Sequence, residues 1–138
     1  MAEDSAAAIR PFFDGATNTV SYLVWDPATR RGAVVDPVLD WDNRSGEADT
    51  ASAAAILAAA EAEGVTIDWV LETHVHADHL TAAPWIKART GARIGIGAGV
   101  KQVQTIFRPV FALSDMLPEG GDFDHLFADG EVFALGSL

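Results

Sequence analysis

The 138-residue chain is 49% hydrophobic and 21% charged, a composition that predicts one soluble globular domain or a piece of a larger one. Its formal net charge of −11 argues against nucleic acid and anionic membrane surfaces as partners, because both repel an acidic protein. The chain has no cysteine, so disulfides and thiolate ligands are excluded, and any metal ion must be held by His, Asp or Glu.

The N-terminal residues 1–10 carry two acidic side chains and a run of alanine. They lack the basic segment and long apolar core of a signal peptide, and no stretch of the chain reaches the roughly 18 apolar residues of a membrane-spanning helix. We therefore expect a disordered segment over residues 1–10, a folded part over residues 11–138, no membrane contact and a cytoplasmic location.

The first predicted elements form a β-hairpin. Residues 18–25 are rich in β-branched and aromatic side chains, which is typical of a strand, and residues 33–35 form its partner after an Asp-Pro turn that ends in glycine. Residues 12–13 indicate the start of an earlier strand. The polar segment 40–49 predicts a loop.

From residue 50 onward, helices and strands alternate. The alanine-rich segment 50–63 has high helix propensity and a glycine just past its end, so it predicts a helix. This order of elements predicts an α/β or α+β layered fold. The remaining predicted elements are a strand at 67–71, a helix at 81–89, a strand at 93–96, a helix at 100–107 and a β-hairpin of 123–127 with 131–135 around Asp129-Gly130.

Metal-ligating side chains are concentrated directly after the strand at 67–71. His74 and His76 are two residues apart, so in an extended segment their imidazoles point the same way and reach one ion. Asp78 and His79 lie at the turn into the next helix, where they serve a neighbouring position or a second ion about 3.5–4 Å away. Such nitrogen and oxygen ligands suit Zn, Fe or Mn.

Other candidates have weaker patterns. Asp36 ends a strand before a proline, and the sequence leaves open whether it orients a ligand histidine or only forms a turn. His125 stands alone in an acidic segment and is not expected to be a ligand. The glycines at 95, 97 and 99 predict a tight strand-to-helix turn, because the phosphate-loop spacing would need glycine at position 100.

The segment 72–81, Glu-Thr-His-Val-His-Ala-Asp-His-Leu-Thr, resembles the signature of the metallo-β-lactamase superfamily. Its flanks at 13–24, 34–39 and 94–97 resemble bacterial persulfide dioxygenase-like members, which are related to glyoxalase II. The resemblance implies an αββα sandwich of the α/β class. The family's later ligand segments, of the Thr-Pro-Gly-His and Gly-Asp-Thr types, do not occur in this sequence, so the chain is expected to correspond to about the N-terminal half of the enzyme.

The resemblance also implies an enzyme activity. In the dioxygenase branch, the first histidine of the motif, here His74, holds one Fe(II) with a later His and Asp, and glutathione persulfide and O2 yield sulfite and glutathione. His76, Asp78 and His79 would then orient water or substrate, with Asp78 and His79 as the expected catalytic residues.

Two alternatives remain open. In a hydrolase of glyoxalase II type, His74 and His76 bind one Zn(II), Asp78 and His79 help bind a second, and the substrate is a glutathione thioester. The other alternative is an inactive, truncated half-domain that binds metal weakly. Because half a sandwich exposes an apolar sheet face, we also expect a homo-oligomer or domain swapping.

Overall fold

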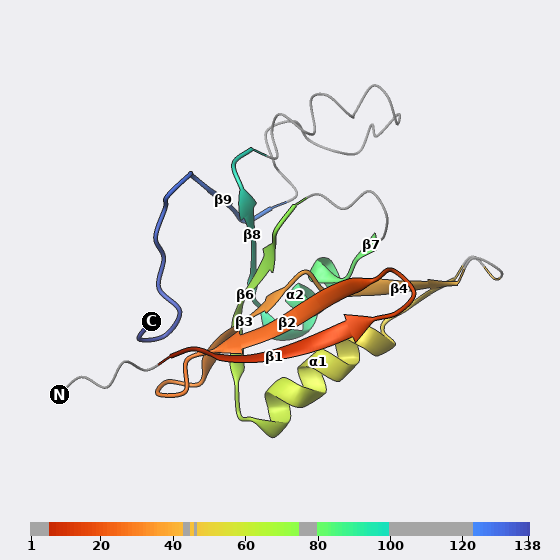
Figure 1. Ribbon diagram of the computed structural model, residues 1–138, viewed down its shortest axis with the longest axis horizontal. Coiled ribbons are helices and arrows are strands. Elements are labelled where there is room, and N and C mark those ends of the chain that lie inside the picture. Colours follow the sequence, from red (N-terminus) through yellow and green to blue (C-terminus); the bar gives the residue numbers. More distant parts are fainter. Residues whose placement is uncertain (1–5, 43–44, 46, 75–79, 100–122) are drawn as a thin grey trace.

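The computed structural model describes residues 6–42, 45, 47–74, 80–99 and 123–138 (Figure 1). The predicted helix at 100–107 lies outside them. Among the described residues, no helix combines the length and apolar character needed to cross a membrane. The elements are β1 (Ala8–Asp14), β2 (Thr19–Trp25), β3 (Arg31–Val35), β4 (Val38–Asp42), β5 (Glu47–Asp49), α1 (Ala51–Ala62), β6 (Thr66–Glu72), β7 (Leu80–Thr81), α2 (Ala83–Thr90), β8 (Arg93–Gly97) and β9 (His125–Phe127).

Six strands form one mixed sheet in the order β1-β2-β3-β6-β8-β9. The first three are antiparallel to one another, which confirms the predicted hairpin of β2 and β3. From β3 to β9 the neighbouring strands are parallel. β1 begins at Ala8, so the folded part starts three residues before the predicted boundary at residue 11.

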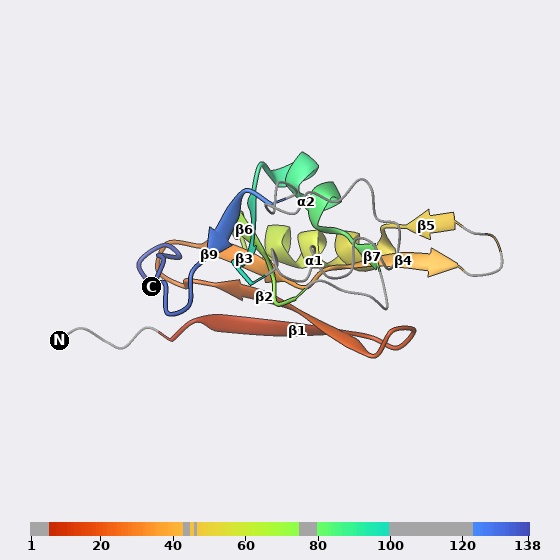
Figure 2. The ribbon, with the colours of Figure 1, turned by 90° about the horizontal axis from the view of Figure 1, so that it is seen from above.

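Both helices cover the same face of this sheet (Figure 2). Ile56 on α1 and Ile86 on α2 are fully buried there, and a buried isoleucine stabilises a fold by about 1.5–3 kcal/mol. Together the sheet and the helices form one α layer and one β layer. Four buried side chains lie side by side at the centre of the covered face, one on each of four neighbouring strands. They are Leu23, Val34, Val70 and Ile94.

Helix α1 lies close to its predicted position. Different interactions determine where it begins and where it ends. At its start, Asp40 on β4 accepts hydrogen bonds from the backbone nitrogen of Ser52 at 2.8 Å and from its hydroxyl at 2.6 Å. A distant carboxylate thus caps the first turn. Past its end, Gly64 has a φ of 66°, a conformation that glycine adopts without strain.

The predicted loop at 40–49 is wrong, because much of it lies in a second, three-stranded sheet of order β5-β4-β7. β4 pairs with β5 on one side and, through Val38 and Thr81, with β7 on the other. These strands are short, and the polar side chain of Asp40 is engaged with α1. Tertiary partners, rather than local propensity, therefore determine their conformation.

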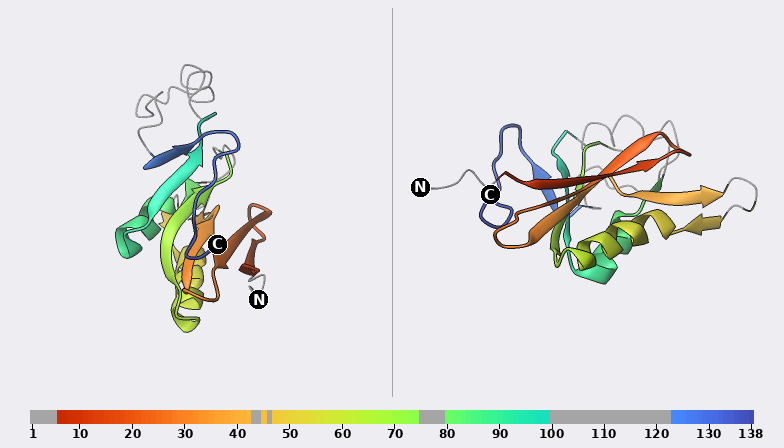
Figure 3. Two further views of the ribbon diagram at one scale, coloured as in Figure 1. Left: turned by 90° about the vertical axis from the view of Figure 1, so that its left-hand side faces the viewer. Right: turned by 60° about the horizontal axis from the view of Figure 1, so that its bottom comes forward.

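The predicted C-terminal hairpin is also wrong. β9 pairs in parallel with β8, and residues 131–135 form no strand. Instead, Phe133 packs on the rings of Trp69 and Phe127, with ring centroids 5.5 and 4.6 Å apart. The segment then runs back to the β2–β3 turn (Figure 3). There the nitrogen and hydroxyl of Ser137 donate to the Asp26 carboxylate.

The face of the sheet opposite the helices is partly open. Strand alternation places Ile9, Phe13 and Tyr22 on it, since their neighbours Leu23 and Phe12 contact the helix-side core. Their exposed fractions are 61%, 69% and 37%. This apolar outer face matches the predicted exposure of one side of a half-sandwich.

Candidate metal-binding site

The predicted metal loop begins at the carboxyl end of β6, beside the carboxyl ends of β3 and β8. Of its candidate ligands, His74 lies within the described residues, whereas His76, Asp78 and His79 lie outside them. Where the structure does describe the chain, no group of three or more His, Asp or Glu side chains gathers at one point. The contacts of His74 are therefore the part of the site that the structure describes.

A chain of hydrogen bonds links His74 to the end of β3. Asp36 follows β3 and accepts bonds from the backbone nitrogen of Thr73 at 2.8 Å and from its hydroxyl at 2.6 Å. The same hydroxyl lies 2.8 Å from Nδ1 of His74. Asp36, Thr73 and His74 thus form a carboxylate–hydroxyl–imidazole relay.

The relay determines which nitrogen of His74 carries the proton. An ionised carboxylate only accepts, so the single hydrogen of the Thr73 hydroxyl goes to Asp36. The hydroxyl oxygen must then accept a hydrogen from Nδ1 of His74, which leaves the lone pair on Nε2. A neutral imidazole in this tautomer binds a metal ion through Nε2, and such outer partners fix the orientation of the ring. Among the described residues, Nε2 of His74 therefore fits a metal ion as one ligand.

Asp36 itself is held in an unusual backbone conformation. Its φ is 50°, which is uncommon for any residue other than glycine but is tolerated by Asp. Its backbone nitrogen donates to the carbonyl of Leu71 at 2.9 Å, and its carbonyl accepts from the buried hydroxyl of Ser21 at 2.7 Å. Asp36 therefore does more than form a turn, because its carboxylate is linked to the His74 ring through the Thr73 hydroxyl.

The chain returns from the loop close to the same junction. Thr81 of β7 pairs with Val38 of β4, and the nitrogen of Ala82 donates to the carbonyl of Pro37 at 3.0 Å. The hydroxyl of Thr81 also donates to the buried carboxylate of Glu72. Both ends of the loop are therefore tied to β4, to β6 or to the turn between β3 and β4.

Sequence reasoning missed Thr73, Ser21, Glu72 and Thr81 as supports of the site. The available signal was position, since Glu72 and Thr73 directly precede the first histidine and Thr81 directly follows the loop. Which partners they bind depends on the pairing of β4 with β7, which has no local signature.

His125 lies away from the metal loop in sequence and belongs to an aromatic cluster. Its Nε2 is 2.6 Å from Oε2 of Glu131, and its ring packs edge-on against Trp69 and Phe127. The backbone nitrogen of Ala128 donates to Glu131, and this bond, with the one from His125, lowers the pKa of the Glu131 carboxyl. The polar partner of His125 is thus the Glu131 carboxylate and not one of the predicted metal ligands.

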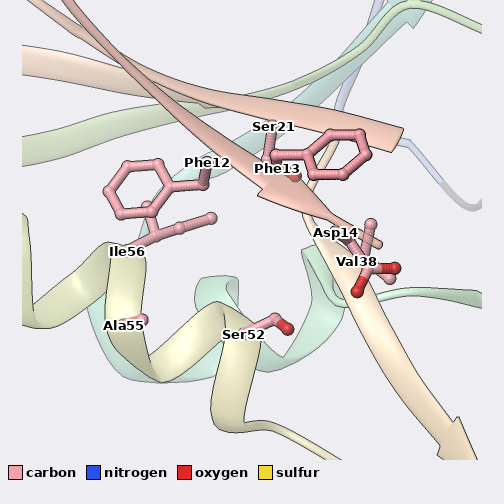
Figure 4. A pocket seen from close by; sticks show the side chains of 8 residues that line it. All are labelled: Phe12, Phe13, Asp14, Ser21, Val38, Ser52, Ala55 and Ile56. Atoms are coloured by element: carbon pink, nitrogen blue, oxygen red, sulfur yellow. The ribbon is translucent and has the colours of Figure 1, made fainter. Parts of the chain in front are cut away.

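A pocket of about 180 Å³ lies between β1 and the start of α1 (Figure 4). Phe12 and Ile56 line one part of it, and Ser21 and Ser52 contribute hydroxyls. Those hydroxyls already donate to the Asp36 carbonyl and to the Asp40 carboxylate. The carboxylate of Asp14 also lines the pocket, and it accepts hydrogen bonds from Thr17.

Comparison with known proteins tests the family resemblance of the whole chain. The family model described as the metallo-beta-lactamase superfamily matches residues 14–134. A Beta-lactamase hydrolase-like protein from Xylella fastidiosa is 48% identical over 127 residues, which are 92% of this chain and 30% of that protein. Glyoxylase B2 from Dictyostelium discoideum is 34% identical and covers 100% of this chain and 47% of its own length.

The structure of ETHE1 from Myxococcus xanthus is similar with a TM-score of 0.51 and 34% identity, over 64% of this chain and 34% of that chain. This chain spans 30% and 47% of the lengths of the two sequence relatives. The predicted fold is confirmed by the family match and by the structural likeness. The chain belongs to the metallo-β-lactamase superfamily.

Proposed function

We propose that this chain supplies the metal loop of a persulfide dioxygenase, which converts glutathione persulfide, O2 and water into glutathione and sulfite. The observation that carries the metal-binding part is the relay from Asp36 through Thr73, which presents Nε2 of His74 as a ligand. The dioxygenase part rests on the resemblance of the segments around the loop to that branch of the superfamily. The part of the chain from β1 onward would form the N-terminal part of the catalytic domain.

The residues of the loop would divide the work between holding the metal and orienting reactants. His74 would bind one Fe(II), which when bound supplies open positions for a sulfur ligand and for O2. His76, Asp78 and His79 would hold water or substrate in place, and Asp78 and His79 would move the protons. The persulfide would be carried on glutathione, in a cytoplasmic protein.

A hydrolase of glyoxalase II type is the second candidate, and the similarity to Glyoxylase B2 favours it. His74 and His76 would then hold one Zn(II) and Asp78 with His79 a second, with a glutathione thioester as substrate. Both proposals use the same loop residues, but His76, Asp78 and His79 bind metal only in the second. The metal and the reaction distinguish them.

Elemental analysis of the purified chain, prepared without chelator and under low oxygen, tests these proposals. Bound iron with sulfite formation from glutathione persulfide supports the dioxygenase, and bound zinc with thioester hydrolysis supports the hydrolase. His74→Ala is the control, and its metal content should fall. A folded wild-type chain with no more iron or zinc than His74→Ala would contradict metal binding by this loop.

A further inference from the structure

We propose that Glu72 and Thr81 form a clamp that sets the span of the metal loop, here residues 73–80, and so act as positioning residues for metal binding. Glu72 is the last residue of β6 and Thr81 is the last residue of β7, so the pair stands at the two ends of the loop. The hydroxyl of Thr81 donates to Oε1 of Glu72 across this gap. The inference rests on the proposed metal site.

The Glu72 carboxylate has a physical need for such a partner. Its residue is 6% exposed, and a buried charge is costly unless hydrogen bonds compensate for lost water. Thr81 has one hydroxyl hydrogen to donate. Its oxygen lies 3.4 Å from the Pro37 carbonyl, which is farther than from the Glu72 carboxylate, so the hydrogen goes to Glu72. The hydroxyl oxygen also accepts from the nitrogen of Ala83 at 3.1 Å, at the start of α2.

The clamp and the relay meet at one junction. The Asp36 carboxylate accepts from Thr73, the first residue of the loop. The carbonyl of Pro37, which follows Asp36, accepts from the nitrogen of Ala82 just beyond the loop. The ends of the loop are thus fixed relative to each other as well as to the sheet. A loop with fixed ends loses less conformational freedom when its side chains gather around an ion, so its affinity is higher.

Thr90 at the other end of α2 offers a matched control. Its hydroxyl accepts from the nitrogen of Ala92, two residues further on, at 3.1 Å, as Thr81 does with Ala83. It donates to the carbonyl of Ile86 at 2.8 Å and makes no contact with the loop ends. Thr90→Val therefore removes a comparable hydroxyl from the same helix without loosening the clamp.

The experiment is a titration of the full chain with Co(II), followed by its visible absorption, for wild type, Thr81→Val, Thr81→Ser and Thr90→Val. We expect Thr81→Val to bind Co(II) about 10–100-fold more weakly, with shifted absorption bands. Thr81→Ser should keep wild-type affinity and bands because it keeps the hydroxyl, and Thr90→Val should keep them despite a similar loss of thermal stability. If Thr81→Val does not fold, Thr81→Ala replaces it, because it also removes the hydroxyl, with at least a threefold loss expected.

The outcomes separate the inference from the function on which it rests. A wild-type chain that binds no Co(II) overturns the proposed metal site. A wild-type chain that binds Co(II), together with a Thr81→Val chain of equal affinity and unshifted bands, overturns the clamp alone. An equal loss in Thr90→Val also overturns it, because the effect would then follow helix stability.

Discussion

Asp36 and Thr73 are 37 residues apart in sequence, yet Thr73 donates both its backbone nitrogen and its hydroxyl to the Asp36 carboxylate. The arrangement joins the end of β3 to the start of the metal loop, because β3 and β6 are parallel neighbours. The Thr73 hydroxyl is therefore the side-chain link between the Asp36 carboxylate and the His74 ring.

Thr73→Val should remove that connection while keeping the shape of the side chain. We expect metal affinity to fall about 10–100-fold, and the proton of His74 to redistribute from Nδ1 towards Nε2. Competition with a chelating dye measures the affinity, and nitrogen NMR of the histidine ring measures the tautomer. Thr17→Val is the matched control, since Thr17 binds Asp14 in the same way at the β1–β2 turn. Unchanged affinity in Thr73→Val would contradict the relay.

The sequence predicted the parts of the fold that have a local cause. The β-branched pattern of β2 and the alanine-rich segment of α1 are visible without knowledge of the rest of the chain. The short β4 is not, because its partners β5 and β7 are brought to it by the fold. The Asp129-Gly130 turn favoured an antiparallel hairpin, but packing of Phe133 on Trp69 outweighs that preference.

In the candidate site, too, some features have a local cause in the sequence and others depend on the fold. The spacing of His74 and its neighbours in the loop indicated metal chemistry directly, because a lone histidine is often structural whereas a tight cluster of His and Asp seldom is. The partners that orient His74 are Asp36, which directly follows β3, and Thr73, which directly precedes His74. Their roles depend on which strands lie side by side, and a sequence pattern does not state this.

Gly95→Ala tests whether the aromatic cluster depends on the missing side chain at this position. A Cβ at Gly95 would lie 2.5 Å from Cε2 of Phe127 and 3.3 Å from Cζ3 of Trp69, so the rings would have to move. We expect a loss of about 1–3 kcal/mol in the free energy of unfolding, measured by denaturant titration. Gly97→Ala on the same strand is the control, since a Cβ there meets nothing within 4 Å. Equal losses would contradict the packing argument.

Asp40→Ala tests the distant cap of α1. Removing the carboxylate leaves the Ser52 nitrogen without this acceptor, so the free energy of unfolding should fall by about 1 kcal/mol. Ser52→Ala removes only the hydroxyl bond and should cost less. In the double variant the two losses should not add, because they share one partner. Full additivity in thermal or chemical unfolding would show that Asp40 acts elsewhere.

The apolar outer face predicts self-association of the chain, as a homo-oligomer or a domain swap. Phe13 is 69% exposed on this face, and its removal from water would favour contact between two copies. Light scattering at rising concentration should show association that Phe13→Ser weakens. Val132→Ser is the control, because Val132 is 91% exposed but lies outside the sheet. A monomeric wild-type chain at high concentration would contradict the prediction.

Asp26 should make the attachment of the C-terminal segment sensitive to acid. The hydroxyl and then the nitrogen of Ser137, with smaller help from Thr29 and Ala28, hold the pKa of the Asp26 carboxyl well below its usual range. A carboxyl whose pKa is lower in the folded chain stabilises the fold fully above its unfolded-chain pKa of about 3.9. That stabilisation is lost as the pH falls through the lower, folded-state value.

Asp26→Asn should therefore be less stable than wild type at pH 7, and the difference in stability should shrink as the pH falls below about 4. Urea titrations of both chains between pH 7 and pH 2 measure this difference. Asp124 also has a lowered pKa, chiefly because Lys87 donates to it, but it is present in both chains and cancels in the comparison. A difference that stays constant down to pH 2, or grows, would show that Asp26 holds Ser137 without its charge.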